Sequence, residues 1–205
     1  MTIILAAKSC DEIVVVYDTI GYYTLFGISM PIYNVRKVQS IDNGNMCIGV
    51  SGYVDPDREI AKFNKLIKNS RKPHIEFLTE LIEAEMWLST SKSKDGLSTK
   101  NYIVGAVEHS GLHLLVSSSE GYSKVKEAEC CGIGCGMYPE VTKLLEEGYS
   151  ANIDRTRLLI LLYRAFDLAN ILSRERQEDN KILRGCGTAR LTQQGYLQDN
   201  FIGKS

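Results

Sequence analysis

The chain begins with the run Met1-Thr2-Ile3-Ile4-Leu5-Ala6-Ala7-Lys8-Ser9-Cys10-Asp11-Glu12-Ile13-Val14-Val15-Val16-Tyr17-Asp18, around which the rest of the fold can be arranged. Residues 2–7 and 13–17 are almost continuously apolar, which is typical of strands that are buried on both faces. The polar residues 9–12 between them favour a turn. We therefore expect two neighbouring strands of a buried sheet, with a Thr opening the first and an Asp closing the second.

The spacing of apolar residues predicts the later elements. Alternating segments joined by short polar turns indicate hairpins around 42–45 and 109–111. Apolar residues at helical spacing indicate four helices, with Asp55 and Asp154 as N-caps and Pro56 at the first position of the first helix. The predicted elements are strands 35–41 and 46–51, helices 55–67 and 75–88, strands 102–108 and 112–117, helices 138–148 and 154–173, and strands 182–186 and 189–191.

This order of elements decides between two architectures. Two antiparallel sheets between two pairs of helices would give each sheet one face on the other sheet and one face under helices. A doubly wound parallel sheet would need helices that alternate with single strands, which the two predicted hairpins contradict. We therefore predict an α/β protein with a four-layer αββα sandwich, built as a single domain over residues 1–205.

Composition excludes several kinds of partner. The chain has 24 Lys and Arg against 25 Asp and Glu, so its formal charge is -1, and like charges do not form long runs. Neither nucleic acid nor a membrane surface is therefore an expected partner. The longest apolar runs are too short for a membrane span, and the first residues lack the features of a signal peptide, so we expect a cytoplasmic protein.

The six cysteines are expected to be free thiols, because no secretion signal accompanies them. Cys130, Cys131 and Cys135 are close enough in sequence to be considered as zinc ligands. Neighbouring residues on a strand point to opposite faces, however, and the spacings of known zinc sites are absent. We therefore expect neither a metal nor another cofactor.

Thr2 is the candidate nucleophile. If Met1 is removed, the Thr2 hydroxyl and the free amine lie on one residue, so a nucleophile and a base come together without a histidine. The three histidines, His74, His109 and His113, are scattered over a helix start and a hairpin, so we expect no histidine-based triad or metal site.

Five features occur in an order that resembles a known family. Thr2 opens the first strand and Asp18 closes the second, Asn34-Val35-Arg36-Lys37-Val38 opens the third, Gly49-Val50-Ser51-Gly52 ends the fourth, and Gly134-Cys135-Gly136 precedes the third helix. Together they resemble a proteasome β-type subunit, somewhat closer to the bacterial HslV protease, both of which are N-terminal nucleophile (Ntn) hydrolases. The resemblance covers roughly residues 2–173.

The resemblance implies a role for each matching residue. Thr2 Oγ would attack a peptide carbonyl while the Thr2 amine accepts the proton. Lys37 would lower the pKa of groups that must lose a proton, and Asp18 would hold Lys37 in place. Gly52 would direct a backbone N–H toward the developing oxyanion, and Cys135 would support the Thr2 amine.

The same resemblance implies a substrate and an assembly. Thr19, Gly21 and Val50 would lie along a peptide that binds by adding a strand to a sheet edge. The protein would be a threonine peptidase in a ring-shaped homo-oligomer, fed with unfolded protein by an ATPase. The apolar segments Met86-Trp87-Leu88 and 22–26, the latter expected to be a loop, are candidate contacts between subunits.

Two departures from the family pattern leave alternatives open. Cys135 stands where the family has a Ser, and thiols are weaker hydrogen-bonding groups than hydroxyls. Where the family has an Asp at the end of the fourth helix, this chain offers Asn170, Ile171 or Ser173, with Asp167 one turn earlier. The alternatives are a catalytically silent structural subunit, or an Ntn amidase or acyl transferase that acts on another amide. No propeptide precedes Thr2, so activation would require only the removal of Met1.

Overall fold

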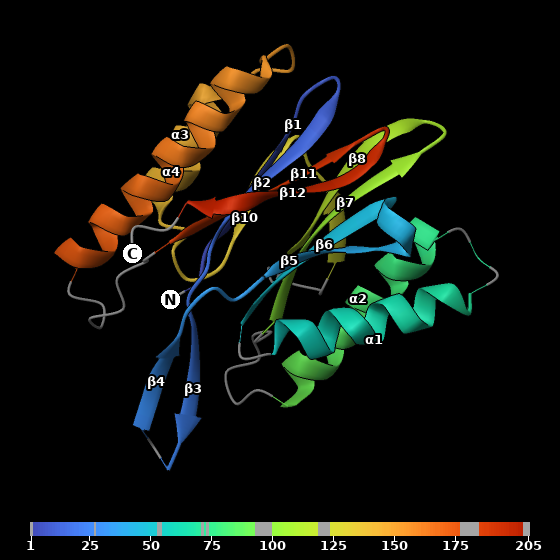
Figure 1. Ribbon diagram of the computed structural model, residues 1–205, viewed down its shortest axis with the longest axis horizontal. Coiled ribbons are helices and arrows are strands. Elements are labelled where there is room, and N and C mark those ends of the chain that lie inside the picture. The colour runs from blue at the N-terminus through green and yellow to red at the C-terminus, as the bar shows by residue number, and fades with distance from the viewer. Residues whose placement is uncertain are drawn as a thin grey trace.

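The computed structural model describes residues 2–26, 28–52, 55–70, 72, 74–92, 100–118, 124–176 and 185–202. Within these residues the chain forms two five-stranded antiparallel sheets, a separate two-stranded hairpin and four α-helices (Figure 1). The predicted α/β class with antiparallel sheets is therefore confirmed.

The first sheet is built around the two strands at the start of the chain. β1 pairs with β2 on one edge and with β10 on the other, so that Ile4 lies opposite both Tyr17 and Ile133. β2 then pairs with β11, which places Cys186 opposite Asp18. The strand order is β10 (Cys130–Ile133), β1 (Ile4–Lys8), β2 (Glu12–Asp18), β11 (Cys186–Thr192) and β12 (Gly195–Ile202).

The second sheet contains both predicted hairpins. The turn between its first two strands is a single 3-10 turn, Asp42–Gly44, in which Asp42, Asn43 and Gly44 all have positive φ. Asp and Asn tolerate this left-handed conformation better than most residues, and Gly adopts it freely. The strand order is β5 (Val38–Ile41), β6 (Met46–Gly52), β7 (Lys100–Glu108), β8 (Gly111–Ser118) and β9 (Lys124–Glu127).

Three apolar cores join these elements. Alternate residues of β1 and β2, such as Leu5 and Val14, pack against α3 (Pro139–Gly148) and α4 (Arg155–Glu175). The intervening residues, such as Ile4 and Val15, face the second sheet. The opposite face of the second sheet packs against α1 (Pro56–Lys68) and α2 (His74–Lys92), so each sheet has a helix pair on its outer side (Figure 1).

The predicted starts of α1 and α4 agree with the structure, and in both helices a capping side chain fixes the first turn. The Asp55 carboxylate accepts from the backbone N–H groups of Asp57 and Arg58 at the start of α1. Asp154 accepts from Arg157 N–H at the start of α4. These bonds satisfy donors that a helix N-terminus otherwise leaves without a partner.

Several expectations about local structure were wrong. Residues 22–26 belong mostly to β3 (Gly21–Leu25), which pairs with β4 (Ile28–Ile32) in a hairpin that projects from the body (Figure 1). β9 and β12 were not predicted, because β9 has a single apolar residue and β12 has little alternation. α2 ends at Lys92, four residues beyond the predicted end of this helix at residue 88. The strands predicted at 182–186 and 189–191 are not two strands, because Cys186 and residues 189–191 all belong to β11, and residues 182–184 lie outside the described residues.

Candidate active site

The antiparallel pairing of β1 and β2 brings Thr2 close to Asp18. Because Ile4 lies opposite Tyr17, the residues before Ile4 run alongside the end of β2. The Asp18 N–H donates to Ile3 O at 3.1 Å, and the Ile3 N–H donates to Asp18 Oδ1 at 2.8 Å. The start of the chain is thus fixed to the end of the second strand by both backbone and side chain.

Lys37 links Asp18 to the Thr2 hydroxyl. Its ammonium lies 2.5 Å from Asp18 Oδ2 and donates to Thr2 Oγ at 3.2 Å. Asp18 is 0% exposed and Lys37 is 3% exposed, although both are charged residue types. The structure therefore brings together three residues that lie far apart in the sequence, in the order Asp18, Lys37, Thr2.

Burial governs the electrostatics of this group. Desolvation raises the pKa of Asp18 above its ordinary value, while the Lys37 ammonium and the Ile3 N–H act in the opposite direction. A buried charge of this kind requires its partner nearby, because an unpaired ion in the interior carries a large desolvation penalty. The Lys37 charge is consequently held at a fixed place next to Thr2 Oγ.

The turn after β10 closes around the Thr2 backbone. Thr2 N–H donates to Cys135 Sγ at 3.2 Å, and Gly136 N–H donates to Thr2 O at 3.3 Å. Gly134 has φ +106, and an added Cβ there would lie 2.1 Å from Thr2 O. Only glycine allows the turn to approach the first strand this closely. Cys135 is thus beside Thr2, as the resemblance implied.

Gly52 and Val50 lie on β6, which runs beside the segment that carries Lys37. Val50 N–H donates to Lys37 O at 3.1 Å, and Gly52 ends the strand with φ +124 and an exposed backbone. The Val50 side chain is buried in the core under α1 and α2, so only its backbone faces the candidate site. The oxyanion role of Gly52 stays a prediction.

The remaining two substrate-binding candidates lie between β2 and the Lys37 segment. Thr19 is buried, its N–H donates to Gly185 O, and its carbonyl accepts from Val35 N–H at 2.9 Å. These backbone groups are therefore already engaged within the chain. Gly21 lies on β3, where an added Cβ would stand 3.0 Å from the Val35 side chain. Because Gly21 has no side chain, β3 can pass this close to Val35.

The positions on α4 are less uniform. Ile171 is half exposed and Ser173 is buried, while the buried amide oxygen of Asn170 has no hydrogen-bond partner in the described part of the chain. Burial raises the pKa of Cys186 to about 12, and the charges of Asp167 and Asp18 act in the same direction. Among the four α4 candidates, Asp167 is therefore the one whose charge acts on Cys186 of β11, which lies opposite Asp18.

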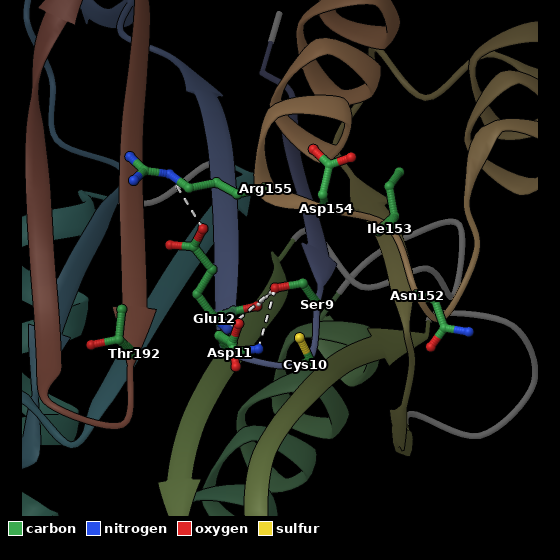
Figure 2. A pocket seen from close by; sticks show the side chains of 9 residues that line it. All are labelled: Ser9, Cys10, Asp11, Glu12, Asn152, Ile153, Asp154, Arg155 and Thr192. Atoms are coloured by element: carbon green, nitrogen blue, oxygen red, sulfur yellow. Dashed lines mark hydrogen bonds and ion pairs between the residues drawn. The ribbon is translucent and has the colours of Figure 1, made fainter.

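A hollow at the other end of β1 is separate from this group. It encloses about 460 Å³ and lies at the turn between β1 and β2, next to the start of α4 (Figure 2). Its buried carboxylate, Glu12, pairs with Arg155 at 3.4 Å and with Arg190 at 3.5 Å. The hollow is lined by Ser9, Cys10, Asp11, Glu12, Asn152, Ile153, Asp154, Arg155 and Thr192.

One group of polar side chains was missed. The histidines were expected to be too scattered to form a catalytic arrangement, yet His113 lies within hydrogen-bonding distance of both Ser110 and Glu127. The sequence does contain a signal: residues on two sides of a tight turn are brought together by strand pairing. Glu127 could not have been added to this group, because its strand was not predicted.

The described residues contain no group of three or more His, Cys, Asp or Glu side chains placed to bind a metal ion. Of the helices in this part of the chain, none is both long enough and apolar enough to cross a membrane. Comparison with known proteins finds no family model that matches this chain and no curated protein with a matching sequence.

Proposed function

We propose that this chain is an N-terminal threonine peptidase of the proteasome and HslV kind. The observation that carries the proposal is the contact series from buried Asp18 through Lys37 to the Thr2 hydroxyl, at 2.5 Å and 3.2 Å. A lysine ammonium beside a threonine hydroxyl favours the alkoxide form electrostatically. A buried carboxylate that holds this ammonium in place is the arrangement that an activated hydroxyl nucleophile needs.

The proposed reaction uses the chain's own first residue twice. Thr2 Oγ attacks the carbonyl carbon of a peptide bond, and the free Thr2 amine accepts the hydroxyl proton and passes it to the leaving amine. Water then hydrolyses the Thr2 ester and regenerates the enzyme. The amine is free only when the mature chain begins at Thr2, so the removal of Met1 is part of the proposal.

Two neighbours would support the reaction. The Gly52 backbone N–H is our candidate donor to the oxyanion, since Gly52 ends β6 beside the Lys37 segment with an exposed backbone. Cys135 Sγ lies 3.2 Å from Thr2 N, where it would orient the amine after Met1 is removed. The thiol would serve as a weak hydrogen-bond partner in place of a hydroxyl.

The packing of the sheets and helices supports the same proposal. Three cores in succession join a helix pair, two sheets and a second helix pair, which is the order of a four-layer αββα sandwich. We assign this arrangement to the Ntn hydrolases and treat the whole chain as one such domain. Architecture alone does not define chemistry, so the site carries the functional argument.

Self-association is a further part of the proposal. The projecting hairpin carries Phe26, which is 95% exposed, and α2 carries Trp87, which is 66% exposed. Exposed large apolar side chains are common where proteins meet. We propose a closed ring of copies that encloses the Thr2 sites and receives unfolded protein from an ATPase.

The test is an intact-mass measurement of the purified protein before and after incubation with a peptide vinyl sulfone. The mass before incubation reports whether Met1 has been removed, and peptide mapping afterwards locates the adduct. We expect an adduct on Thr2 and none in the Thr2→Ala variant, which should keep its fold but lose peptide hydrolysis.

Two other results would redirect the assignment. A chain that lacks Met1 but carries no adduct and cleaves no peptide would favour the silent structural subunit. An adduct on Thr2 with hydrolysis of simple amides but not of peptides would favour an amidase or acyl transferase.

A further inference from the structure

A second arrangement of nucleophile, base and acid lies at the tip of the β7–β8 hairpin. Ser110 Oγ and His113 Nε2 are 2.7 Å apart, and His113 Nδ1 is 3.1 Å from Glu127 Oε1. Both distances are within hydrogen-bonding range. The three side chains therefore form a continuous series, Ser110, His113, Glu127. They lie on the second sheet, whereas Thr2 lies just before β1 of the first sheet.

Strand register explains why these residues meet. Glu108 pairs with Gly111 across the turn, which places Ser110 at the tip, and His113 follows two residues later on β8. Leu115 lies opposite Glu127 on β9, and His113 is two residues before Leu115 on the same face. Such diagonal neighbours are within reach of long side chains.

The surroundings orient the imidazole. Leu112 and Leu114 point into the core between the sheets, so His113 points to the opposite face. An ionised carboxylate can only accept hydrogen bonds, so in the neutral imidazole Glu127 holds the proton on Nδ1. Nε2 is then the acceptor for the Ser110 hydroxyl proton. This is the tautomer that a general base needs.

The nucleophile is accessible. Ser110 and Glu127 are exposed, and the His113 side chain is 25% exposed. An added Cβ on the neighbouring Gly111 would meet no atom of the described residues within 4 Å. Because Ser110 is exposed, a small ester can reach its hydroxyl from solvent.

We propose that Ser110, His113 and Glu127 form a second nucleophilic site, independent of Thr2, that hydrolyses small activated esters. Ser110 Oγ bonds to the ester carbonyl carbon while its proton passes to His113 Nε2. The bond from this carbon to the leaving oxygen breaks, and the departing alcohol takes the proton from Nε2. Water then attacks the Ser110 ester, passes a proton to Nε2 and releases the acid, and Nε2 returns the proton to Ser110. Ser110 and His113 are the catalytic residues and Glu127 is a positioning residue.

The experiment uses p-nitrophenyl acetate with the full-length Thr2→Ala protein, which removes the other candidate nucleophile. We expect release of p-nitrophenol and an acetyl group that peptide mapping locates on Ser110. Ser110→Ala and His113→Gln should each lower the rate by about a hundredfold, as for loss of a nucleophile or general base. Glu127→Gln should lower kcat with KM unchanged. The matched control is His109→Gln, an exposed histidine of the same turn, which should keep the full rate.

Several outcomes would overturn the proposal. They are an unmodified Ser110, a Ser110→Ala protein that hydrolyses the ester at the full rate, or an equal loss of rate in His109→Gln. The mapping requires no change at Ser110, His113 or Glu127, so it decides the question even if one of those variants fails to fold. Because mapping separates an adduct on Thr2 from one on Ser110, this site and the proposed peptidase site can fail independently.

Discussion

Replacing Lys37 with Met should lower the free energy of unfolding far more than the loss of an exposed lysine charge. The change removes the ammonium but keeps much of the side-chain volume, which leaves the Asp18 carboxylate with 0% exposure and without its ion-pair partner. Breaking a buried ion pair costs about 3 to 5 kcal/mol of unfolding free energy. Domains are stable by only about 5 to 15 kcal/mol, so the loss would be readily measured.

A surface ion pair provides the matched comparison. Lys143 and Glu147 lie one helical turn apart at 3.7 Å, with side chains 72% and 68% exposed. Pairs of this kind contribute about 0.3 to 0.5 kcal/mol. Urea unfolding monitored by circular dichroism should therefore show a large loss for Lys37→Met and almost none for Lys143→Met.

The Asp18→Asn and Lys37→Met double variant completes the cycle. It removes both charges, so its loss of stability should be much smaller than the sum of the two single losses. Peptidase activity should follow the same pattern, with each single change lowering the rate by about a hundredfold and the double change adding little more. Single losses of stability that simply add in the double variant would refute the coupled pair.

The pH dependence of Lys37→Met has a definite sign. Burial raises the pKa of Asp18, and removal of Lys37 takes away the group that opposes this shift. The pKa of this carboxyl in the unfolded chain is near 3.9. Below that pH, a carboxyl whose pKa is raised in the folded state is neutral in both states, and its contribution to stability is complete. That contribution is lost as the pH rises through the folded-state pKa. The stability deficit of Lys37→Met should therefore shrink on acidification from pH 7, and a deficit that grows would contradict this reasoning.

Three further predictions concern other parts of the molecule. Gly134→Ala should abolish peptide hydrolysis, because the new Cβ would lie 2.1 Å from Thr2 O. Gly111 also has positive φ, so Gly111→Ala should lower stability but leave peptide hydrolysis intact. Equal losses of peptidase activity in the two variants would contradict the steric argument. A thiol reagent at pH 8 should modify exposed Cys135 before Cys47, since burial raises the pKa of Cys47 to about 12. Peptide mapping of the native protein would show the order of modification, and modification of Cys47 first would contradict this prediction. Light scattering should report a mass several times 22.9 kDa that falls in Phe26→Ser, because this side chain is 95% exposed; a monomer at all concentrations would exclude the ring.

The sequence predicted best those elements that local chemistry determines. Asp55 and Pro56 define the start of α1 without help from any distant residue. The turn at Asp42–Gly44 follows in the same way from residues that tolerate positive φ. Cys130 and Cys131 face different cores, as alternation along a strand requires.

Elements that depend on distant partners were predicted less well. β9 exists because its backbone pairs with β8, and its sequence, Lys124-Val125-Lys126-Glu127, has too few apolar residues to indicate a strand. The contact of Glu127 with His113 depends on that pairing. Within the candidate site, the approach of Asp18, Lys37 and Thr2 was expected from a family resemblance, whereas the burial of Val50 and Thr19 emerges only from the packing.

The pairing of β1 with β10 on one side and β2 on the other should slow the exchange of backbone amide hydrogens with water near the start of the chain. Chain ends usually fray, and their amide hydrogens exchange with water almost freely. Here the second residue precedes a strand that is paired on both edges, and the amide of fully buried Ile3 donates to Asp18. The Ile3 amide should consequently exchange as slowly as one in the middle of the sheet. Its deuterium uptake would report directly on whether the Asp18 carboxylate is in place, without any substrate.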